Sequence, residues 1–186
     1  MVLINGYHNS FFDVFMDWVS WPFTWLPLYA IILILLGRKF GWKAALVQLL
    51  LIVILITLVD QGCNHLFKNM FQRYRPCHNE ILKSQLHIIG GCGGLYGFVS
   101  AHAANTFAVA VFAGSLLGKR FLFFLLCWSS VVGYSRIYLG VHYPADVVIG
   151  ACWGTGLSLL FIKAVTKPEF SKRFLKPILK HKNDAS

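Results

Sequence analysis

Five long apolar runs constrain the fold of this 186-residue chain more than any other feature of its sequence. They are Pro22 to Leu36, Ala44 to Val59, Ala103 to Leu117, Phe121 to Tyr134 and Val147 to Ile162. A helix that crosses a bilayer needs ~20 mostly apolar residues, so each run must extend through its polar flanks. One such run would fit a buried helix of a soluble protein, but five do not. We therefore expect an all-α, polytopic transmembrane helical bundle with about five spans.

The composition agrees with this interpretation. Hydrophobic residues make up 57% of the chain and charged residues only 13%, whereas a soluble domain carries about 25% charged residues. Too few charges are present to cover the surface of a soluble fold of this size. The sequence therefore predicts an integral membrane protein.

The first 21 residues differ from the apolar runs because they mix aromatic and polar residues. Phe11, Phe12, Phe15 and Trp18 recur at helical spacing, which is typical of a helix lying in the membrane interface. A sixth span is the alternative for this segment. The N-terminus has no basic region and no small-residue cleavage site, so we expect no cleavable signal peptide. We divide the rest into a membrane domain, residues 22–164, and a basic cytoplasmic tail, residues 165–186.

The net charge of +10 is distributed unevenly along the predicted topology. One side carries Arg38, Lys39, Lys43, Lys119, Arg120 and the seven Lys and Arg residues from Lys163 onward; the other carries Lys68, Arg73, Arg75, Lys83 and Arg136. Basic loops favour the cytoplasm. The first side has twelve Lys and Arg residues and the second has five, so we place the first side in the cytoplasm. This pattern describes membrane topology, and we expect no nucleic-acid partner. On the outer side, Arg73 would point away from Arg75 if both lay on a helix, so Arg73 is interpreted as an interfacial residue.

The long outer segment from Cys77 to Phe98 contains a glycine-rich stretch, His87 to Gly97. The stretch lacks the strand and the Lys-Ser/Thr of a nucleotide-binding loop, so a surface loop is expected. Cys77 and Cys92 share the segment and can pair in an oxidising compartment; two free thiols are the equal alternative. The five cysteines of the chain form no CxxC pair, which argues against a zinc site.

Three polar clusters converge on the predicted outer face. They consist of Lys68 with Arg75 and Pro76, of Ser100 and His102, and of Arg136, His142 and Asp146. Arginine and lysine suit tetrahedral oxyanions, and amides at a helix N-terminus also favour anions. One histidine can attack and another can protonate a leaving oxygen, while the aspartate holds an imidazole in one tautomer. Together these groups describe phosphoryl transfer through a covalent phosphohistidine.

The three clusters resemble the tripartite signature of the type 2 phosphatidic acid phosphatase family. That signature reads Lys, six residues, Arg-Pro; then Pro-Ser-Gly-His; then Ser-Arg, five residues, His, three residues, Asp. The first and third blocks fit in every spacing, from Lys68 to Pro76 and from Ser135 to Asp146. In the second block, Val99 and Ala101 stand where the family has Pro and Gly, which leaves fine detail of the amide contacts open.

The resemblance implies a role for each residue of the motifs. His142 is the nucleophile, Asp146 orients it, and His102 protonates the leaving group. The phosphate is bound by Lys68, Arg75, Ser100, Arg136 and backbone amides near Ala101. The resemblance implies a helical bundle and a reaction without a metal or other cofactor.

The expected function is therefore that of a membrane phosphatase which hydrolyses a lipid phosphate or lipid pyrophosphate at the outer face. Undecaprenyl pyrophosphate, lipid A phosphate, phosphatidylglycerophosphate and phosphatidate all remain open as substrates. A lipid phosphotransferase and a non-enzymatic phospholipid-binding membrane protein are the alternatives. We expect the inner (cytoplasmic) membrane as the location, with the site facing the periplasm or exterior. The sequence leaves the oligomeric state open.

Overall fold

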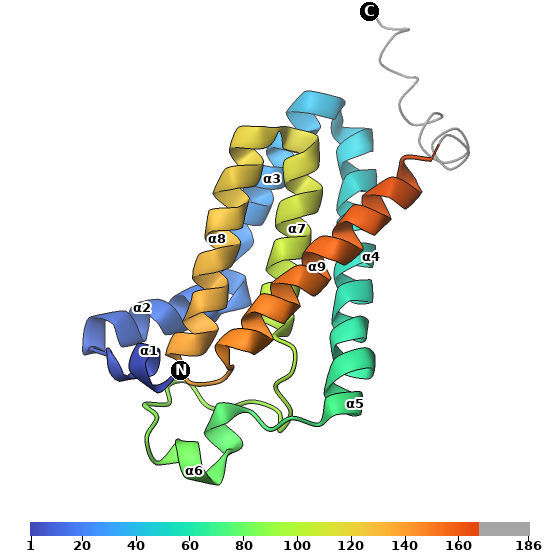
Figure 1. The fold of residues 1–186 in the computed structure, drawn as a ribbon. Coiled ribbons are helices and arrows are strands. Elements are labelled where there is room, and N and C mark those ends of the chain that lie inside the picture. The colour runs from blue at the N-terminus through green and yellow to red at the C-terminus, as the bar shows by residue number, and fades with distance from the viewer. Residues whose placement is uncertain (168–186) are drawn as a thin grey trace, which may run out of the picture.

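The computed structural model describes residues 1–167, and this part of the chain is built from helices without a β-sheet (Figure 1). Residues 168–186, most of the predicted cytoplasmic tail, lie outside the described part. The predicted all-α class is confirmed.

Five long helices form the bundle. They are α3 (Leu26–Phe40), α4 (Trp42–Gly62), α7 (Ala101–Leu117), α8 (Lys119–Tyr138) and α9 (Pro144–Val165). Each contains most or all of one predicted apolar run. Four helical stretches within the described residues, 22–40, 42–71, 119–138 and 144–165, are long and apolar enough to cross a membrane, and α7 is a shorter apolar helix. The chain is thus an integral membrane protein.

The second span is longer than its apolar run predicts. A π-helical segment, Cys63–Lys68, and the short helix α5 (Asn69–Phe71) continue α4 to a total of 30 residues. The helix ends at Gln72, which adopts the left-handed conformation with φ 44°. This extension carries Lys68 beyond the apolar run to the end of the bundle that holds the other predicted site residues.

Two short N-terminal helices lie at the end of the bundle where α8 meets α9 (Figure 1). These are α1 (Val2–Gly6) and α2 (Ser10–Ser20), and the Asn9 side chain caps α2 by accepting a hydrogen bond from the Phe12 amide. Phe11, Phe15 and Trp18 are exposed on α2. These exposed aromatic side chains match the predicted interfacial helix, whose position relative to a bilayer stays a prediction.

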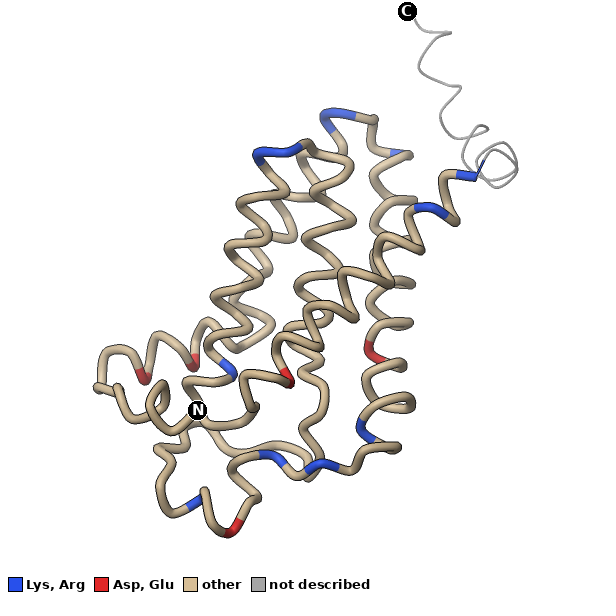
Figure 2. The backbone as a smooth tube through the Cα atoms, viewed as in Figure 1, with Lys and Arg blue, Asp and Glu red and all other residues tan. Residues whose placement is uncertain are grey.

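Figure 2 shows basic residues gathered at the opposite end, where α3 joins α4 and α7 joins α8. Next to these two short connections lie Arg38 and Lys39 at the end of α3, Lys43 at the start of α4, and Lys119 and Arg120 at the start of α8. A 3-10 turn, Pro22–Trp25, leads from α2 into α3. A second 3-10 turn, Pro76–His78, and helix α6 (Glu80–Lys83) lie in the long loop between α5 and α7. The bundle therefore has one basic end and one end that carries the predicted site.

Helix α7 forms the centre of the bundle and packs against α4, α8 and α9. Its contact with α9 is close because Gly150 and Gly154 face its backbone. A Cβ atom on Gly154 would lie 1.9 Å from the Ala104 carbonyl oxygen, and one on Gly150 would lie 2.6 Å from that of Ser100. Small residues four positions apart allow two helices to approach closely in a membrane. This contact sets the start of α7 against the start of α9, where both histidines of the motifs lie.

Candidate active site

The predicted site residues come from separate parts of the chain and lie at one end of the bundle. Lys68 ends the π-helical segment, Arg75 follows α5, Ser100 and His102 lie at the start of α7, Arg136 lies in the last turn of α8, His142 lies between α8 and α9, and Asp146 lies in the first turn of α9. The structure joins several of them by direct contacts.

His142 and Arg75 form the central contact of the site. The Arg75 Nη1 atom lies 2.9 Å from His142 Nε2, and it also donates to the Val141 carbonyl oxygen at 3.2 Å. Because a guanidinium group only donates, His142 Nε2 must accept and carry a lone pair. The imidazole proton is then on Nδ1, which lies 3.5 Å from Asp146 Oδ2. The two groups are close enough for an ionic contact, but Nδ1 has no hydrogen-bond partner among the described residues.

His142 is buried, and its environment keeps it neutral. Burial lowers the pKa of His142 to about 4; the nearby Asp146 carboxylate opposes this effect, and the Arg75 and Arg136 charges add to it. A neutral imidazole with a lone pair on Nε2 is the form that attacks an electrophile. The environment therefore prepares His142 as a nucleophile at neutral pH.

Asp146 is fully buried and is held from several directions. Its Oδ2 atom accepts from the Tyr143 amide at 2.9 Å in a capping box at the start of α9. Pro144 occupies the first turn, where its missing amide hydrogen is not needed. The Asp146 carbonyl oxygen accepts from the Ser100 amide at 2.9 Å. The aspartate thus connects the second motif to the third.

Arg73 corrects one interpretation of the sequence. It does not serve only at the interface, because its Nη1 atom lies 3.1 Å from Asp146 Oδ1 and its guanidinium lies 4.1 Å from the centre of the Tyr143 ring. The helical spacing assumed for Arg73 and Arg75 is wrong, since α5 ends at Phe71. After the left-handed Gln72, the chain is extended and Tyr74 forms a bridge with Tyr96. Alternate residues of an extended segment point the same way.

The other predicted phosphate-binding groups lie around this core. Arg136 donates from Nη1 to the Ser20 hydroxyl of α2. The Ser100 hydroxyl is buried and has no hydrogen-bond partner among the described residues, directly before the amide groups at Ala101 that begin α7. Lys68 instead donates to Asn64 one turn earlier, at 2.8 Å. An unpaired hydroxyl beside a helix N-terminus and two guanidinium groups can hold a tetrahedral anion.

A cavity of about 630 Å³ opens beside His102 and Arg136. Its remaining walls come from Ile89 of the glycine-rich loop and from α2 with the two residues that follow it. The residues of this second group are Asp13, Val14, Asp17, Trp18, Ser20, Trp21 and Pro22. Sequence reasoning missed this contribution of α2. The only signal for it was a pair of aspartates on a helix otherwise rich in aromatic residues.

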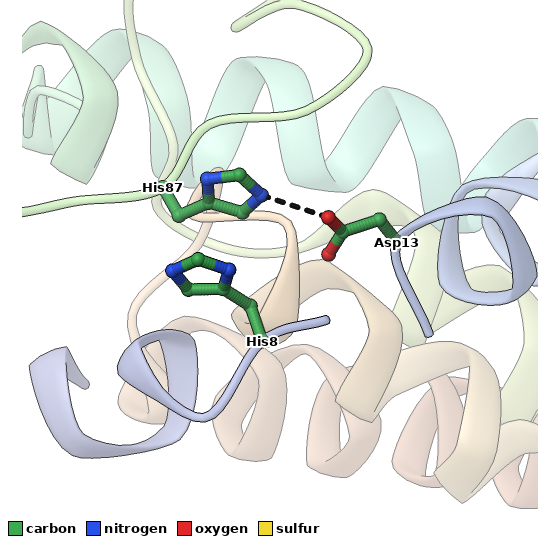
Figure 3. Close-up of side chains that lie close together, drawn as sticks. All are labelled: His8, Asp13 and His87. Atoms are coloured by element: carbon green, nitrogen blue, oxygen red, sulfur yellow. Dashed lines mark hydrogen bonds and ion pairs between the residues drawn. The ribbon is translucent and has the colours of Figure 1, made fainter. Parts of the chain in front are cut away.

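A second group of titratable side chains lies nearby, as Figure 3 shows. His8, Asp13 and His87 place possible metal ligands within 4.8 Å of one another. However, the two imidazole rings are stacked, with centroids 3.7 Å apart and planes 9° apart. A metal bound about 2.0 Å from each ring nitrogen must lie near both ring planes, which two parallel, stacked planes do not allow. In this arrangement, the 3.0 Å contact between His87 and Asp13 instead joins the N-terminal segment to the loop.

The loop that supplies Arg75 is closed by a disulfide between Cys77 and Cys92. Of the two alternatives that the sequence left open, the structure has the paired one. The bond lies near the Arg75 side chain, which donates from Nε to the Gly94 carbonyl oxygen at 2.7 Å. The disulfide therefore restrains the loop on which this guanidinium depends.

Comparisons with known proteins agree with the motifs. The model of the PAP2 superfamily matches residues 46–169. The lipid A 4'-phosphatase of Bacteroides thetaiotaomicron is 40% identical over 157 residues, which cover 83% of this chain and 70% of that protein. The lipid A 4'-phosphatase of Porphyromonas gingivalis is 32% identical, over 81% of this chain and 65% of that protein.

A solved structure is also similar. The crystal structure of LpxE from Aquifex aeolicus has a TM-score of 0.61 and 24% sequence identity, and the match covers 87% of this chain and 91% of that chain. This likeness shows the shared helical fold. The family and the relatives confirm the prediction of a membrane phosphatase that acts on lipids. The chain belongs to the PAP2 superfamily.

Proposed function

We propose that this protein hydrolyses a phosphate monoester of a lipid of the lipid A type, through a phosphohistidine on His142. The observation that carries the chemistry is the arrangement of Arg75, His142 and Asp146, which leaves a lone pair on His142 Nε2. The similarity to two lipid A 4'-phosphatases supports the substrate.

In the first step, the lone pair of His142 Nε2 forms a bond to phosphorus. The bond between phosphorus and the headgroup oxygen breaks, and its electron pair stays on that oxygen, which takes a proton from His102. Asp146 stabilises the positive charge on the imidazole by accepting from Nδ1. In the second step, water attacks phosphorus and gives its proton to His102, and the bond to Nε2 breaks. Inorganic phosphate leaves, and both histidines return to their starting forms.

The non-bridging oxygens of the phosphate carry the developing charge. Lys68, Arg75, Arg136, the Ser100 hydroxyl and the amides near Ala101 would hold them. Arg75 contacts His142 Nε2 at 2.9 Å in this structure, so an incoming phosphate takes the place between the two groups. The guanidinium then donates to phosphate oxygens, and its charge supplies stabilisation that needs no rearrangement of solvent.

We place the protein in the inner membrane with its site on the periplasmic side. Two features support this orientation. The basic connections gather at the end opposite to the site (Figure 2), and basic loops favour the cytoplasm. The Cys77–Cys92 disulfide lies at the end that holds the site, and disulfides persist in oxidising compartments such as the periplasm.

The function is tested by phosphate release from the purified protein in detergent with EDTA present throughout. The panel contains lipid A, undecaprenyl pyrophosphate, phosphatidylglycerophosphate and phosphatidate. We expect release in EDTA, with lipid A as the best substrate. Binding of these lipids without any release would contradict the proposal and favour a lipid-binding protein. Transfer of phosphate to a second lipid in place of water would favour a phosphotransferase.

The pH dependence of kcat/KM should reflect the low pKa of His142. Burial lowers this pKa from 6.5 to about 4, so the reactive neutral form is present above pH 4 and is lost as the pH falls through that value. When kcat/KM is measured from pH 3.5 to 8, we expect it to fall on the acidic side with an apparent pKa near 4 that belongs to the enzyme. The ionisation of the substrate is determined separately by phosphorus NMR. A fall in kcat/KM with an enzyme pKa near 6.5 would show that burial does not lower the pKa of His142.

Arg73 is proposed as a positioning residue that acts through Asp146. Arg73→Gln leaves one oxygen of a buried carboxylate without its ion pair, which weakens the hold on His142. We expect kcat to fall about tenfold with little change in KM, and Arg73→Lys to retain most of the rate. Lys83→Gln, an exposed charge in the same outer loop, is the matched control. Equal kcat in wild type and Arg73→Gln would remove Arg73 from the mechanism.

A further inference from the structure

Helix α2 connects the N-terminal segment to the predicted phosphate site. Ser20, buried at the end of α2, accepts a hydrogen bond from Arg136. The match to the PAP2 superfamily begins at residue 46, so α2 lies outside the part of the chain that matches the family model. The catalytic groups belong to the matched part, whereas most of the cavity wall beside them does not.

The cavity lies on the leaving-group side of the site. It reaches His102, the proposed proton donor to the headgroup oxygen, and Arg136, one of the proposed phosphate ligands. Whatever is attached to that oxygen must occupy the space next to His102. The volume of about 630 Å³ is within the ~300–1,000 Å³ typical of small-molecule pockets.

Two carboxylates line this space. Asp13 is held in place, since Tyr138 donates to Oδ1 at 2.8 Å and His87 lies 3.0 Å from Oδ2. Asp17 forms no ion pair within residues 1–167, and its Oδ1 atom packs so close to Gly90 that a Cβ there would lie 2.6 Å away. A carboxylate is able to accept hydrogen bonds from the hydroxyl groups of a ligand, and its charge repels a second phosphate.

Aromatic side chains complete the wall. Trp18 and Trp21 line the cavity and are 53% and 58% exposed. An indole offers a flat apolar face and a hydrogen-bond donor at its edge. Flat aromatic faces beside carboxylate acceptors match a sugar ring, which has apolar C–H faces and hydroxyl groups at its edge.

We propose that this α2-lined cavity binds the headgroup and selects an uncharged, hydroxyl-rich leaving group over a phosphate. Asp17 is the specificity-determining residue, because it disfavours lipid pyrophosphates, whose leaving group is a second phosphate. This inference rests on the proposed function and adds the group that sets its substrate preference. The helix thus distinguishes sugar phosphomonoesters from pyrophosphates without contacting the nucleophile.

The test compares kcat/KM for lipid A and undecaprenyl pyrophosphate in wild type, Asp17→Asn and Glu80→Gln. Asn keeps the shape of the side chain and removes the charge. We expect Asp17→Asn to shift the ratio of the two values about tenfold toward the pyrophosphate. Glu80→Gln, an exposed acid at the same end of the bundle, should leave the ratio unchanged. An unchanged ratio in Asp17→Asn, or a wild type that prefers the pyrophosphate, overturns the inference.

A second pair of variants tests the aromatic wall. Trp21→Leu should raise KM for lipid A about fivefold and leave KM for phosphatidate unchanged, because only the first substrate presents a sugar ring. Trp42→Leu is the matched control for Trp21→Leu, because Trp42 is also 58% exposed but lies at the basic end of the bundle, away from the cavity. Equal losses on both substrates in Trp21→Leu would mean that this residue only anchors α2.

Failure of this inference is distinguishable from failure of the proposed function. A wild type that releases no phosphate from any lipid contradicts the proposed function itself. A wild type that hydrolyses lipid A, combined with unchanged ratios in Asp17→Asn, leaves the function in place and removes only the role of the cavity.

Discussion

His142→Ala is expected to lower phosphate release by about 10⁴-fold or more, because the variant lacks the atom that bonds to phosphorus. The arginines and the start of α7 would still bind the phosphate, so KM should change far less than kcat. The measurement is phosphate release under substrate saturation. His65→Ala, which changes an exposed histidine on the extension of α4, should retain the wild-type rate.

The same variant tests the covalent intermediate. Wild type mixed with a lipid labelled at phosphorus and then rapidly denatured should carry label that is lost in acid and stable in base, as expected of a phosphohistidine. His142→Ala should carry no such label. Release at the wild-type rate from His142→Ala would show that water attacks the substrate directly or that another residue is the nucleophile.

Gly154→Leu is expected to have the second-largest effect, through the fold. Even a Cβ at this position would lie 1.9 Å from the backbone oxygen of Ala104, so α7 and α9 must separate. We expect a loss of about 3 kcal/mol or more in stability, by the mechanism of overpacking. The activity should fall as well, since the same contact places the start of α7 beside His142 and Asp146.

The measurement is the thermal unfolding midpoint in detergent, together with phosphate release. Gly156→Leu is the matched control because a Cβ on Gly156 has no heavy atom within 4 Å. This variant lies only two residues away on the same helix and should unfold near the wild-type midpoint. Wild-type stability of Gly154→Leu would mean that α7 and α9 are not held by this contact.

Several features could be predicted from the sequence because they depend on short-range patterns. Apolar runs predicted the five long helices, since hydrocarbon length and backbone hydrogen bonding leave few alternatives in a membrane. The spacing of the motifs predicted the family. One interfacial helix was expected in residues 1–21, where the structure has two helices, α1 and α2, and the interfacial position stays a prediction. The roles of His142, His102, Asp146 and the phosphate-binding residues remain predictions that the variants above test.

Other features depended on contacts between distant segments. Arg73 was assigned to the interface because a helix was assumed after Lys68, whereas α5 ends at Phe71 and the next residues are extended. The pairing of Cys77 with Cys92 was left open because spacing alone does not bring two thiols together. The second span extends through its polar flank as expected, but the π-helical form of that extension, Cys63–Lys68, was not predicted.

By itself, the sequence determined the class of the protein, its helices and the family, because apolar length and motif spacing are properties of the chain alone. Only the tertiary structure decided that Arg73 contacts Asp146, that Arg75 contacts His142 and that α2 lines a cavity beside His102. These contacts join residues more than 60 positions apart. They depend on how closely α7 and α9 pack and on where α4 ends, which no local pattern of residues specifies.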